Sequence, residues 1–210
     1  MTQHTAILRS LVGAAILTVL VAGCAGAPPP GYYTLGAIPP SSPAASVTPP
    51  ALISVGPVDL PDYLDRRPIV TRDNAFAVRL AGNDYWAAPL QEMVPRVLVS
   101  DLAMRLPADR IEGFPQISDS VGDYRIVIDV SRFDVDTSGM ATLIARWRLY
   151  GRNTPQPLLV ADETLQRQAE AGGYGAGAAA LSTTLGDLAD RLAQAVTTVR
   201  ARAPRAIGSS

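Results

Sequence analysis

The order of two hydrophobic periodicities limits the fold of this chain more than any other feature. Near the C-terminus, apolar residues recur every three or four positions, which predicts one long amphipathic helix with a single buried face. The residues of this stripe are Leu181, Leu185, Leu188, Leu192, Val196 and Val199. Before the stripe, the apolar residues of segments 124–130 and 143–149 alternate, and segment 158–168 follows a turn. These three segments are predicted to be strands, so the fold combines a sheet with helices.

Two details predict how the first two of these strands pair. The apolar residues of 133–135 have the opposite parity from those of 124–130, which predicts a β-bulge near Ser131-Arg132. The sequence Thr-Ser-Gly at 137–139 predicts the turn of a hairpin. Because most ligands of a calcium loop are missing, we interpret residues 134–139 as a polar turn and not as a metal site.

The chain before residue 81 also predicts β structure. Segment 53–58 is apolar at spaced positions but contains Gly56-Pro57, which predicts an edge strand or a bulge. Segments 68–71 and 76–80 flank Asp73-Asn74, and this combination is typical of a hairpin.

A first helix is predicted over residues 90–106. Pro89 suits the first turn of a helix, whereas Pro95 predicts a kink or a later start. Residues 175–180 match G-x-G-x-x-A. Since no further strand follows the last helix, we interpret them as a flexible hinge before that helix and not as a dinucleotide site. Together the elements predict an α+β fold: a two-layer sandwich with a mixed or antiparallel sheet and two main helices packed on one face.

The N-terminal segment has the features of a secretory signal. Residues 1–23 contain no acid, and their apolar run (11–23) is shorter than the roughly 20 residues that a membrane-spanning helix needs. The run ends in Leu-Val-Ala-Gly-Cys at 20–24, which resembles a bacterial lipobox. We therefore expect cleavage between Gly23 and Cys24 and acylation of the Cys24 thiol, for example with palmitate. An ordinary secretory signal is the alternative.

Removal of that signal would leave few reactive side chains. His4 is the single histidine, Cys24 is the single cysteine, and all 18 basic residues are arginine. Ser-His-Asp and Cys-His catalysis, Schiff-base chemistry and Cys/His zinc sites are thereby excluded as they are usually built. A formal net charge of −1 argues against a nucleic-acid binder. We expect no cofactor, no metal and no catalytic residue.

Carboxylates are the remaining candidates for chemistry. Asp59, Asp62 and Asp65 share a loop with Arg66 and Arg67. We expect surface ion pairs there and not acid–base groups.

The predicted boundaries divide the chain into four parts. A signal peptide (1–23) precedes a lipidated, proline-rich tether with a Tyr-Tyr segment (24–50), a domain (51–202) and a disordered tail (203–210). Within the tether, Tyr32, Tyr33 and Leu35 form an apolar island between two proline-rich stretches. We expect this island to dock as a short strand on the domain or on a partner.

Four short motifs together resemble one family. They are Gly-Tyr-Tyr-Thr-Leu at 31–35, Val-Gly-Pro-Val-Asp-Leu-Pro-Asp-Tyr-Leu-Asp-Arg at 55–66, Ile69-Val70, and Trp-Ala-Ala-Pro-Leu at 86–90. This set is similar to the PqiC (YmbA) family of ABC-type transport auxiliary lipoproteins. The motif residues to which the resemblance assigns a structural role are Gly56, Pro57, Pro61, Tyr63, Leu64, Arg66 and Trp86.

The resemblance implies a small α/β sandwich with a structural, non-enzymatic role. It implies a lipid-anchored protein that faces the periplasm and accompanies MCE-domain proteins and an ABC transporter in lipid transport between two membranes. A ring-like homo-oligomer is implied by analogy. Because Ala25 and not an aspartate follows Cys24, the resemblance points to the outer membrane. The alternatives are a lipoprotein that carries a lipid or small ligand itself, and a carboxylate-based envelope hydrolase.

Overall fold

The computed structural model describes residues 28–41, 49–114, 122–170 and 172–202. Gly23 and Cys24, the predicted signal peptide and the predicted tail therefore lie outside the described residues. Every element below belongs to the compact unit that begins at Gly31. Within the described residues, no helix is both long and apolar enough to cross a membrane.

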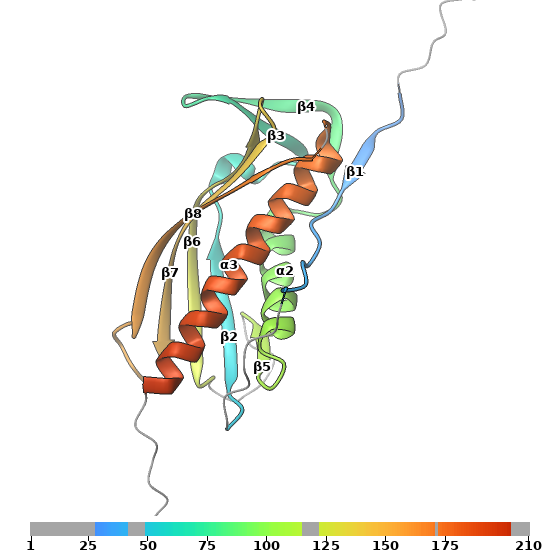
Figure 1. Ribbon diagram of the computed structural model, residues 1–210. Coiled ribbons are helices and arrows are strands. Elements are labelled where there is room, and N and C mark those ends of the chain that lie inside the picture. The colour runs from blue at the N-terminus through green and yellow to red at the C-terminus, as the bar shows by residue number, and fades with distance from the viewer. Residues whose placement is uncertain (1–27, 42–48, 115–121, 171, 203–210) are drawn as a thin grey trace, which may run out of the picture. The chain divides into compact units, whose positions relative to one another are not determined.

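The described residues form one mixed sheet and two long helices (Figure 1). The strands are β1 (Gly31–Tyr33), β2 (Leu52–Asp59), β3 (Pro68–Asn74), β4 (Ala77–Trp86), β5 (Arg110–Gly113), β6 (Tyr124–Asp136), β7 (Met140–Gly151) and β8 (Leu159–Gln168). The helices are α2 (Leu90–Arg105) and α3 (Tyr174–Arg202), and a single 3₁₀ turn, η1 (Asp62–Leu64), follows β2.

The long strand β6 organises the sheet. One edge of β6 pairs in parallel with β2 along its first half and with β3 at its end, through Thr71↔Val135 and Arg72↔Asp136. The other edge pairs antiparallel with β7, which pairs antiparallel with β8. On the far side of β3, β4 pairs antiparallel with β3, and β1 pairs in parallel with the end of β4. The predicted hairpin at 137–139 is confirmed. The hairpin of β3 and β4 is also confirmed, but its turn is at Ala75-Phe76, and Asp73-Asn74 belong to β3.

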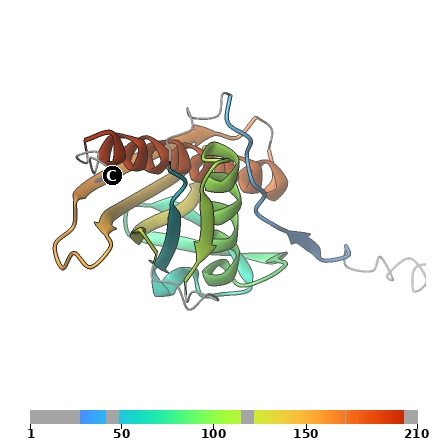
Figure 2. The same ribbon diagram turned by 90° about the horizontal axis from the view of Figure 1, so that it is seen from below.

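Both helices lie on the same face of the sheet, side by side, as Figures 1 and 2 show. Helix α3 packs against β6, β7 and β8, whereas α2 packs against β2 and β5. The predicted stripe is the buried face of α3: Leu185, Leu188 and Val196 have no exposed surface. Helix α2 begins at Leu90 and continues through Pro95, so a later start was wrong. The predicted two-layer α+β fold is confirmed.

Both predicted irregularities of the strands are present. The register of β6 with β7 shifts between Val130 and Arg132, and the register of β2 with β6 shifts between Val55 and Val58. Since β2 lies between β6 and β5, the interruption at Gly56-Pro57 is a bulge and not the mark of an edge strand. The short strand β5 was not predicted, because four residues show no usable periodicity.

The interpretation of residues 175–180 as a hinge was wrong. These residues lie inside α3, which begins at Tyr174. A Cβ atom at Gly177 would lie 3.3 Å from Cγ2 of Val135, and one at Gly175 would lie 3.6 Å from the Tyr33 ring. The small residues therefore serve close packing of the first turns of α3 on β6 and β1, and this tertiary contact outweighs the low helix propensity of glycine.

The prediction of surface ion pairs in the loop after β2 was also wrong. Asp59, Asp62, Asp65, Arg66 and Arg67 are exposed, and none of them forms an ion pair among the described residues. Exposed charges gain little from pairing in water, so solvation of each side chain is the stable outcome.

Candidate functional site

The first eleven described residues of the compact unit lead into the domain at the end where β4 meets α2. Strand β1 adds to β4 with the register Tyr32↔Tyr85 and Tyr33↔Trp86. The Tyr33 carbonyl accepts a hydrogen bond from the Ala87 amide (2.8 Å), and the Tyr33 hydroxyl donates one to Asp84 Oδ1 (2.9 Å). This short strand belongs to the sheet of the domain, and we call residues 31–38 the N-terminal strap.

The two tyrosines of the strap face different surroundings. The Tyr33 ring lies 6.1 Å from the Tyr174 ring at the start of α3. The hydrogen bond to Asp84 raises the pKa of the Tyr33 hydroxyl above its ordinary value, so this hydroxyl stays a donor. Tyr32 is 58% exposed, with its ring 5.8 Å from that of Tyr85. Tyr33 therefore secures the strap, whereas Tyr32 presents an aromatic surface to solvent.

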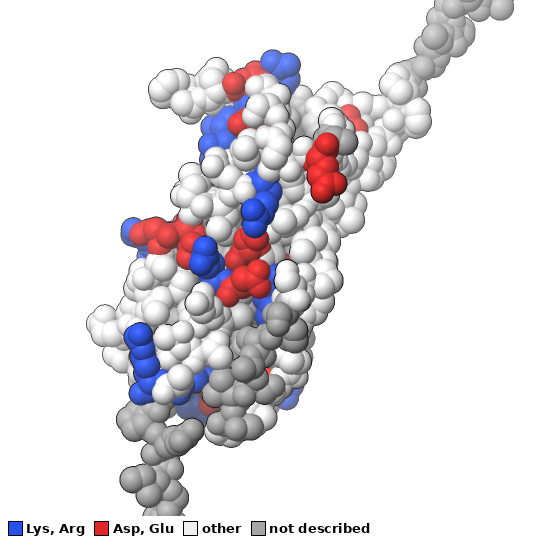
Figure 3. Space-filling view, in the orientation of Figure 1, with Lys and Arg blue, Asp and Glu red and all other residues white. Residues whose placement is uncertain are grey.

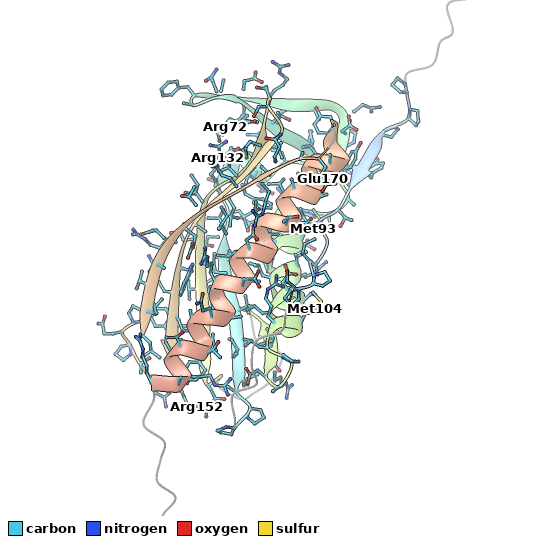
Figure 4. The ribbon with its side chains drawn as sticks, viewed as in Figure 1. Arg72, Met93, Met104, Arg132, Arg152 and Glu170 are labelled. Carbon is cyan, nitrogen blue, oxygen red and sulfur yellow. The ribbon has the colours of Figure 1, made fainter. Side chains whose placement is uncertain are left out.

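Beyond β1, the strap lies over both helices. Leu35 is buried in the core, and Thr34 Oγ1 lies 3.6 Å from Met93 Sδ of α2 (Figure 4). The Gly36 amide donates to Ser182 Oγ of α3 at 3.1 Å. At Gly186 of α3, an added Cβ would lie 3.0 Å from Ile38 Cβ. A glycine at this helix position lets the strap approach the α3 backbone closely.

A buried ionic cluster holds the end of the strap. The Ile38 amide donates to Asp101 Oδ1 (2.7 Å), and the Ile38 carbonyl accepts from Arg105 Nη1 (2.9 Å). Arg105 Nε also pairs with Asp190 Oδ1 of α3 at 2.6 Å. The side chains of Asp101 and Arg105 are almost fully buried, at 0% and 3% exposure. Two helices and the strap are thus tied together through one arginine.

Asp101 is poorly solvated in this cluster. Burial raises the pKa of its carboxyl to about 6, and the nearby Asp190 adds to the rise. The Ile38 amide and Arg105 oppose the rise. Oδ2 of Asp101 is buried without a hydrogen-bond partner, and Arg105 Nη1 lies 3.5 Å from Oδ1. The ionised form of Asp101 is therefore costly in the folded protein.

A second buried carboxylate lies at the junction of β3 and β6. Asp134 is 1% exposed, and it accepts hydrogen bonds from Arg72 Nε (2.8 Å), Arg132 Nε (2.8 Å) and the Tyr63 hydroxyl (2.9 Å). Figure 4 shows the two arginines close together at this junction. This cluster was not predicted, because residue 134 was interpreted only as part of a turn. Since side chains of a strand alternate between its two faces, the apolar neighbours Phe133 and Val135 place Asp134 on the opposite face, and no local signal predicted its burial.

Three motif residues of the resemblance fall on this junction. Tyr63 and Leu64 form η1, where Tyr63 bonds Asp134 and Leu64 is buried. Burial raises the pKa of the Tyr63 hydroxyl, with a further contribution from Asp134. Trp86 is buried at the end of β4 and donates its amide to the Arg67 carbonyl at 2.8 Å. These residues hold the β3–β4 hairpin against the body of the sheet.

The other motif residues shape the backbone near η1. Gly56 has φ +124°, and an added Cβ would lie 2.8 Å from Phe114 Cβ, so only glycine fits there without strain. The Gly56-Pro57 peptide bond is cis. Pro61 caps η1, and Arg66 is exposed after it.

A cleft of about 490 Å³ opens where the β6–β7 turn meets the start of α3. Its lining includes the apolar side chains Ile69, Trp86, Val135 and Leu181 and the acidic side chains Asp136 and Glu170. Figure 4 shows Glu170 between the end of β8 and the start of α3. Burial alone would raise the pKa of Asp136, but hydrogen bonds from Ser138 and Met140 hold it below its ordinary value. The Asp136 carboxylate is therefore engaged in hydrogen bonds within the β6–β7 turn.

Groups of three or more His, Cys, Asp or Glu side chains that could hold a metal ion are absent from the described part of the chain. Of the candidate carboxylates, Asp65 lines a small pocket with Arg66, Arg67 and Trp86, and the lining of that pocket does not include Asp59 or Asp62. Acidic and basic side chains are interspersed on the face of the molecule that Figure 3 shows. Arg167 of β8 pairs with Asp187 of α3 at 2.7 Å. Among the described residues, the N-terminal strap is the segment that hydrogen bonds tie to β4 and to both helices.

Comparison with known proteins places this domain in a class of transport lipoproteins. The family model described as "ABC-type transport auxiliary lipoprotein component" matches residues 33–193. The match runs from Tyr33 in the strap to Ala193 in α3 and includes strands β2 to β8 and helix α2, so the chain belongs to this family. The family resemblance inferred from the four motifs is thereby confirmed.

Two named relatives and two solved structures are similar to the chain. Intermembrane transport lipoprotein PqiC of Escherichia coli (strain K12) is 26% identical over 137 residues, which is 64% of this chain and 71% of that protein; PqiC of Shigella flexneri matches equally. The crystal structure of XCC0632 from Xanthomonas campestris has a TM-score of 0.63 at 20% identity, covering 80% of this chain and 94% of that one. A crystal structure of an uncharacterized protein has a TM-score of 0.67 at 21% identity, covering 80% and 99%. The structural likenesses concern the fold alone.

Proposed function

We propose that this protein is a non-enzymatic, periplasm-facing component of an MCE/ABC-type lipid transport system that links the inner and outer membranes. In this proposal it is held in the outer membrane by acylated Cys24 and docks an MCE-domain protein. Membership of the family of ABC-type transport auxiliary lipoproteins supports the transport role. The similarity to a protein named intermembrane transport lipoprotein PqiC supports a role between two membranes.

The observation that carries the proposal is the N-terminal strap. Strand β1 is hydrogen-bonded to β4, and Ile38 is bonded to Asp101 and Arg105. The domain is therefore fixed to its own N-terminal segment from Gly31 onward. Between Cys24 and Gly31 the chain can span at most about 25 Å when fully extended. A domain on so short a tether is confined near its membrane, which suits an adaptor better than a diffusing carrier.

The arrangement of side chains supports a docking role without catalysis. Each strongly buried carboxylate in the described part of the chain has a structural partner: Asp101 and Arg105 hold the strap, Asp134 joins two arginines, and Asp109 pairs with Arg200 at 2.7 Å. A general acid or base needs a group free to exchange a proton with a substrate. The groups described here are engaged in holding elements together.

Co-purification tests the proposal. The full-length chain is expressed in its native background, membranes are extracted with detergent, and the protein is captured by a C-terminal tag. We expect an MCE-domain protein and transporter subunits to co-elute, and we expect Cys24→Ala to lose them together with outer-membrane fractionation. Recovery of the intact protein with no MCE-domain protein would contradict the docking role.

One observation favours a second candidate function, a lipoprotein that binds a lipid or small ligand itself. The cleft beside the start of α3 is lined in part by Ile69, Trp86, Val135 and Leu181, and its volume lies within the range of small-ligand sites. Native mass spectrometry of the protein extracted in mild detergent distinguishes the two functions. A lipid retained at one copy per chain would favour the carrier, and its loss in Leu181→Trp, which would fill the cleft, would locate it.

A further inference from the structure

Four of the seven large apolar side chains that are exposed among the described residues lie on the β3–β4 hairpin or on the neighbouring strand β1, and the other three are Phe114, Leu158 and Val160. Phe76 is 100% exposed at the tip of the β3–β4 hairpin, Val78 and Leu80 on β4 are 41% and 47% exposed, and Tyr32 on β1 is 58% exposed. We call these four residues the β4 rim. Side chains of this size rarely stay in water without a partner when they are grouped.

The β4 rim lies at the end of the domain where the chain enters. In Figure 1, β4 runs across the upper end, from the hairpin tip to the corner where β1 joins it. Only residues 84–86 of β4 are paired with β1, so the edge formed by residues 77–82 has no strand partner in the described residues. Helix α3 begins near this end and runs away from it for 29 residues, or about 43 Å. The β7–β8 turn and the end of α3 lie at the opposite end.

Charge does not dominate this rim. Asp73 pairs with Arg79 at 2.9 Å, Arg72 pairs with buried Asp134 at 2.6 Å, and Asp84 accepts the Tyr33 hydroxyl. The charged side chains of β3 and β4 thus have partners within the domain. Arg79 is itself 70% exposed, but its charge is paired with Asp73. The other large exposed side chains of the rim are aliphatic or aromatic, and tyrosine and phenylalanine favour the boundary between headgroups and acyl chains.

From these features we infer that the β4 rim lies against the lipid surface in which the protein is anchored. The inference rests on the proposed acylation of Cys24. A tether of at most about 25 Å from Cys24 to Gly31 keeps the entry end, and with it the rim, next to the bilayer. Anchor and rim then make two separate contacts with one membrane, which fixes the orientation of the domain and points α3 away from the surface.

Tryptophan quenching in vesicles tests this contact. The mature, acylated protein is reconstituted into vesicles of phosphatidylethanolamine and phosphatidylglycerol, with or without lipids that carry a nitroxide close to the headgroup. Phe76→Trp reports on the rim, and Val160→Trp is the matched control, because Val160 is 49% exposed on β8 near the β7–β8 turn. The native Trp86 and Trp147 are buried and supply a constant background.

We expect the added emission of Phe76→Trp to fall about two-fold with nitroxide lipid and to shift to shorter wavelength, as for side chains seated in the interfacial region. The Val160→Trp emission should not change. Equal quenching of both variants, or of neither, in protein that stays membrane-bound would overturn the inference and leave the proposed function intact. Protein that does not bind the vesicles would overturn both this inference and the proposed function.

A second variant separates a lipid surface from a protein partner. Phe76→Ser with Val78→Ser and Leu80→Ser removes the apolar part of the rim from exposed positions, and circular dichroism checks that the fold is retained. We expect this variant to stay acylated and to co-elute with the same proteins, while its hairpin becomes accessible to protease in vesicles. Loss of the co-eluting proteins with unchanged protease protection would assign the rim to a protein partner and overturn the inference.

Discussion

The buried carboxyl of Asp101 makes the stability of this protein depend on pH in a direction opposite to that of most paired carboxylates. In the folded protein its pKa is raised by burial to about 6, from an ordinary 3.8. The folded state therefore binds a proton at Asp101 between these two values, where the unfolded chain does not. The free energy of unfolding should increase as the pH falls from about 6 to about 4, and above pH 7 this contribution should be constant and unfavourable.

The magnitude follows from the two pKa values. One pKa unit corresponds to about 1.4 kcal/mol, so the full effect of Asp101 between pH 4 and pH 7 is at most about 3 kcal/mol. Arg105 and the Ile38 amide limit the effect, and Asp190 adds to it. In Asp101→Asn, the side-chain oxygen still accepts the Ile38 amide, but the group no longer titrates. The stability of the variant relative to the parent should therefore rise by up to about 3 kcal/mol from pH 4 to pH 7.

Urea unfolding at several pH values between 4 and 7 measures this difference, with emission of the buried Trp86 and Trp147 as the signal. Comparing parent with variant at each pH removes the contribution of other groups, such as Asp123 and Asp136, whose pKa values are lowered. A difference that stays constant within about 0.5 kcal/mol would refute the reasoning from burial. A difference that falls with rising pH would mean that Arg105 outweighs burial.

Three further outcomes are expected. Cys24→Ala should leave the chain unprocessed and outside the outer-membrane fraction, as membrane fractionation and mass spectrometry will show. Tyr33→Phe removes the hydrogen bond to Asp84 and should speed proteolysis of the strap, whereas Tyr32→Phe should leave the cleavage rate unchanged. Asp134→Ala leaves two arginines without their buried partner and should lower the free energy of unfolding by about 3 kcal/mol or more in urea titrations; Asp162→Ala breaks an exposed pair and should have a much smaller effect.

The fold could be predicted where apolar residues recur along the sequence with a clear period. The α3 stripe and the alternating residues of β6 and β7 are buried as the pattern requires, because burial of one face is the cause of the pattern. The two bulges were also visible: the one near Ser131-Arg132 breaks the parity of an alternating run, and the other contains Gly56-Pro57, which predicted a bulge or an edge strand. Residues 175–180 and β5 were not predicted correctly, because neither carries a period: close packing of glycine on Val135, and pairing with β2, decide their structure.

Much of the candidate site depended on contacts between distant residues. The Tyr-Tyr segment marked the strap, but Asp101, Arg105 and Ser182 lie far from it in sequence and contain no signal of that role. The same is true of Arg72 and Asp134, which are 62 residues apart. An ion pair between residues so far apart in the sequence can be identified only from the tertiary structure, which shows both side chains in contact and buried.

By itself, the sequence determined the α+β class, the family motifs, the expectation of a lipidated Cys24, and the poverty of reactive side chains, because these are properties of composition and local order. The tertiary structure decided where the N-terminal strap is held, which carboxylates are buried, and that the β4 rim shares one end with the point where the chain enters. Burial and pairing depend on contacts between segments that are far apart in the sequence. The free energy of these contacts depends on the whole folded chain and not on any one segment.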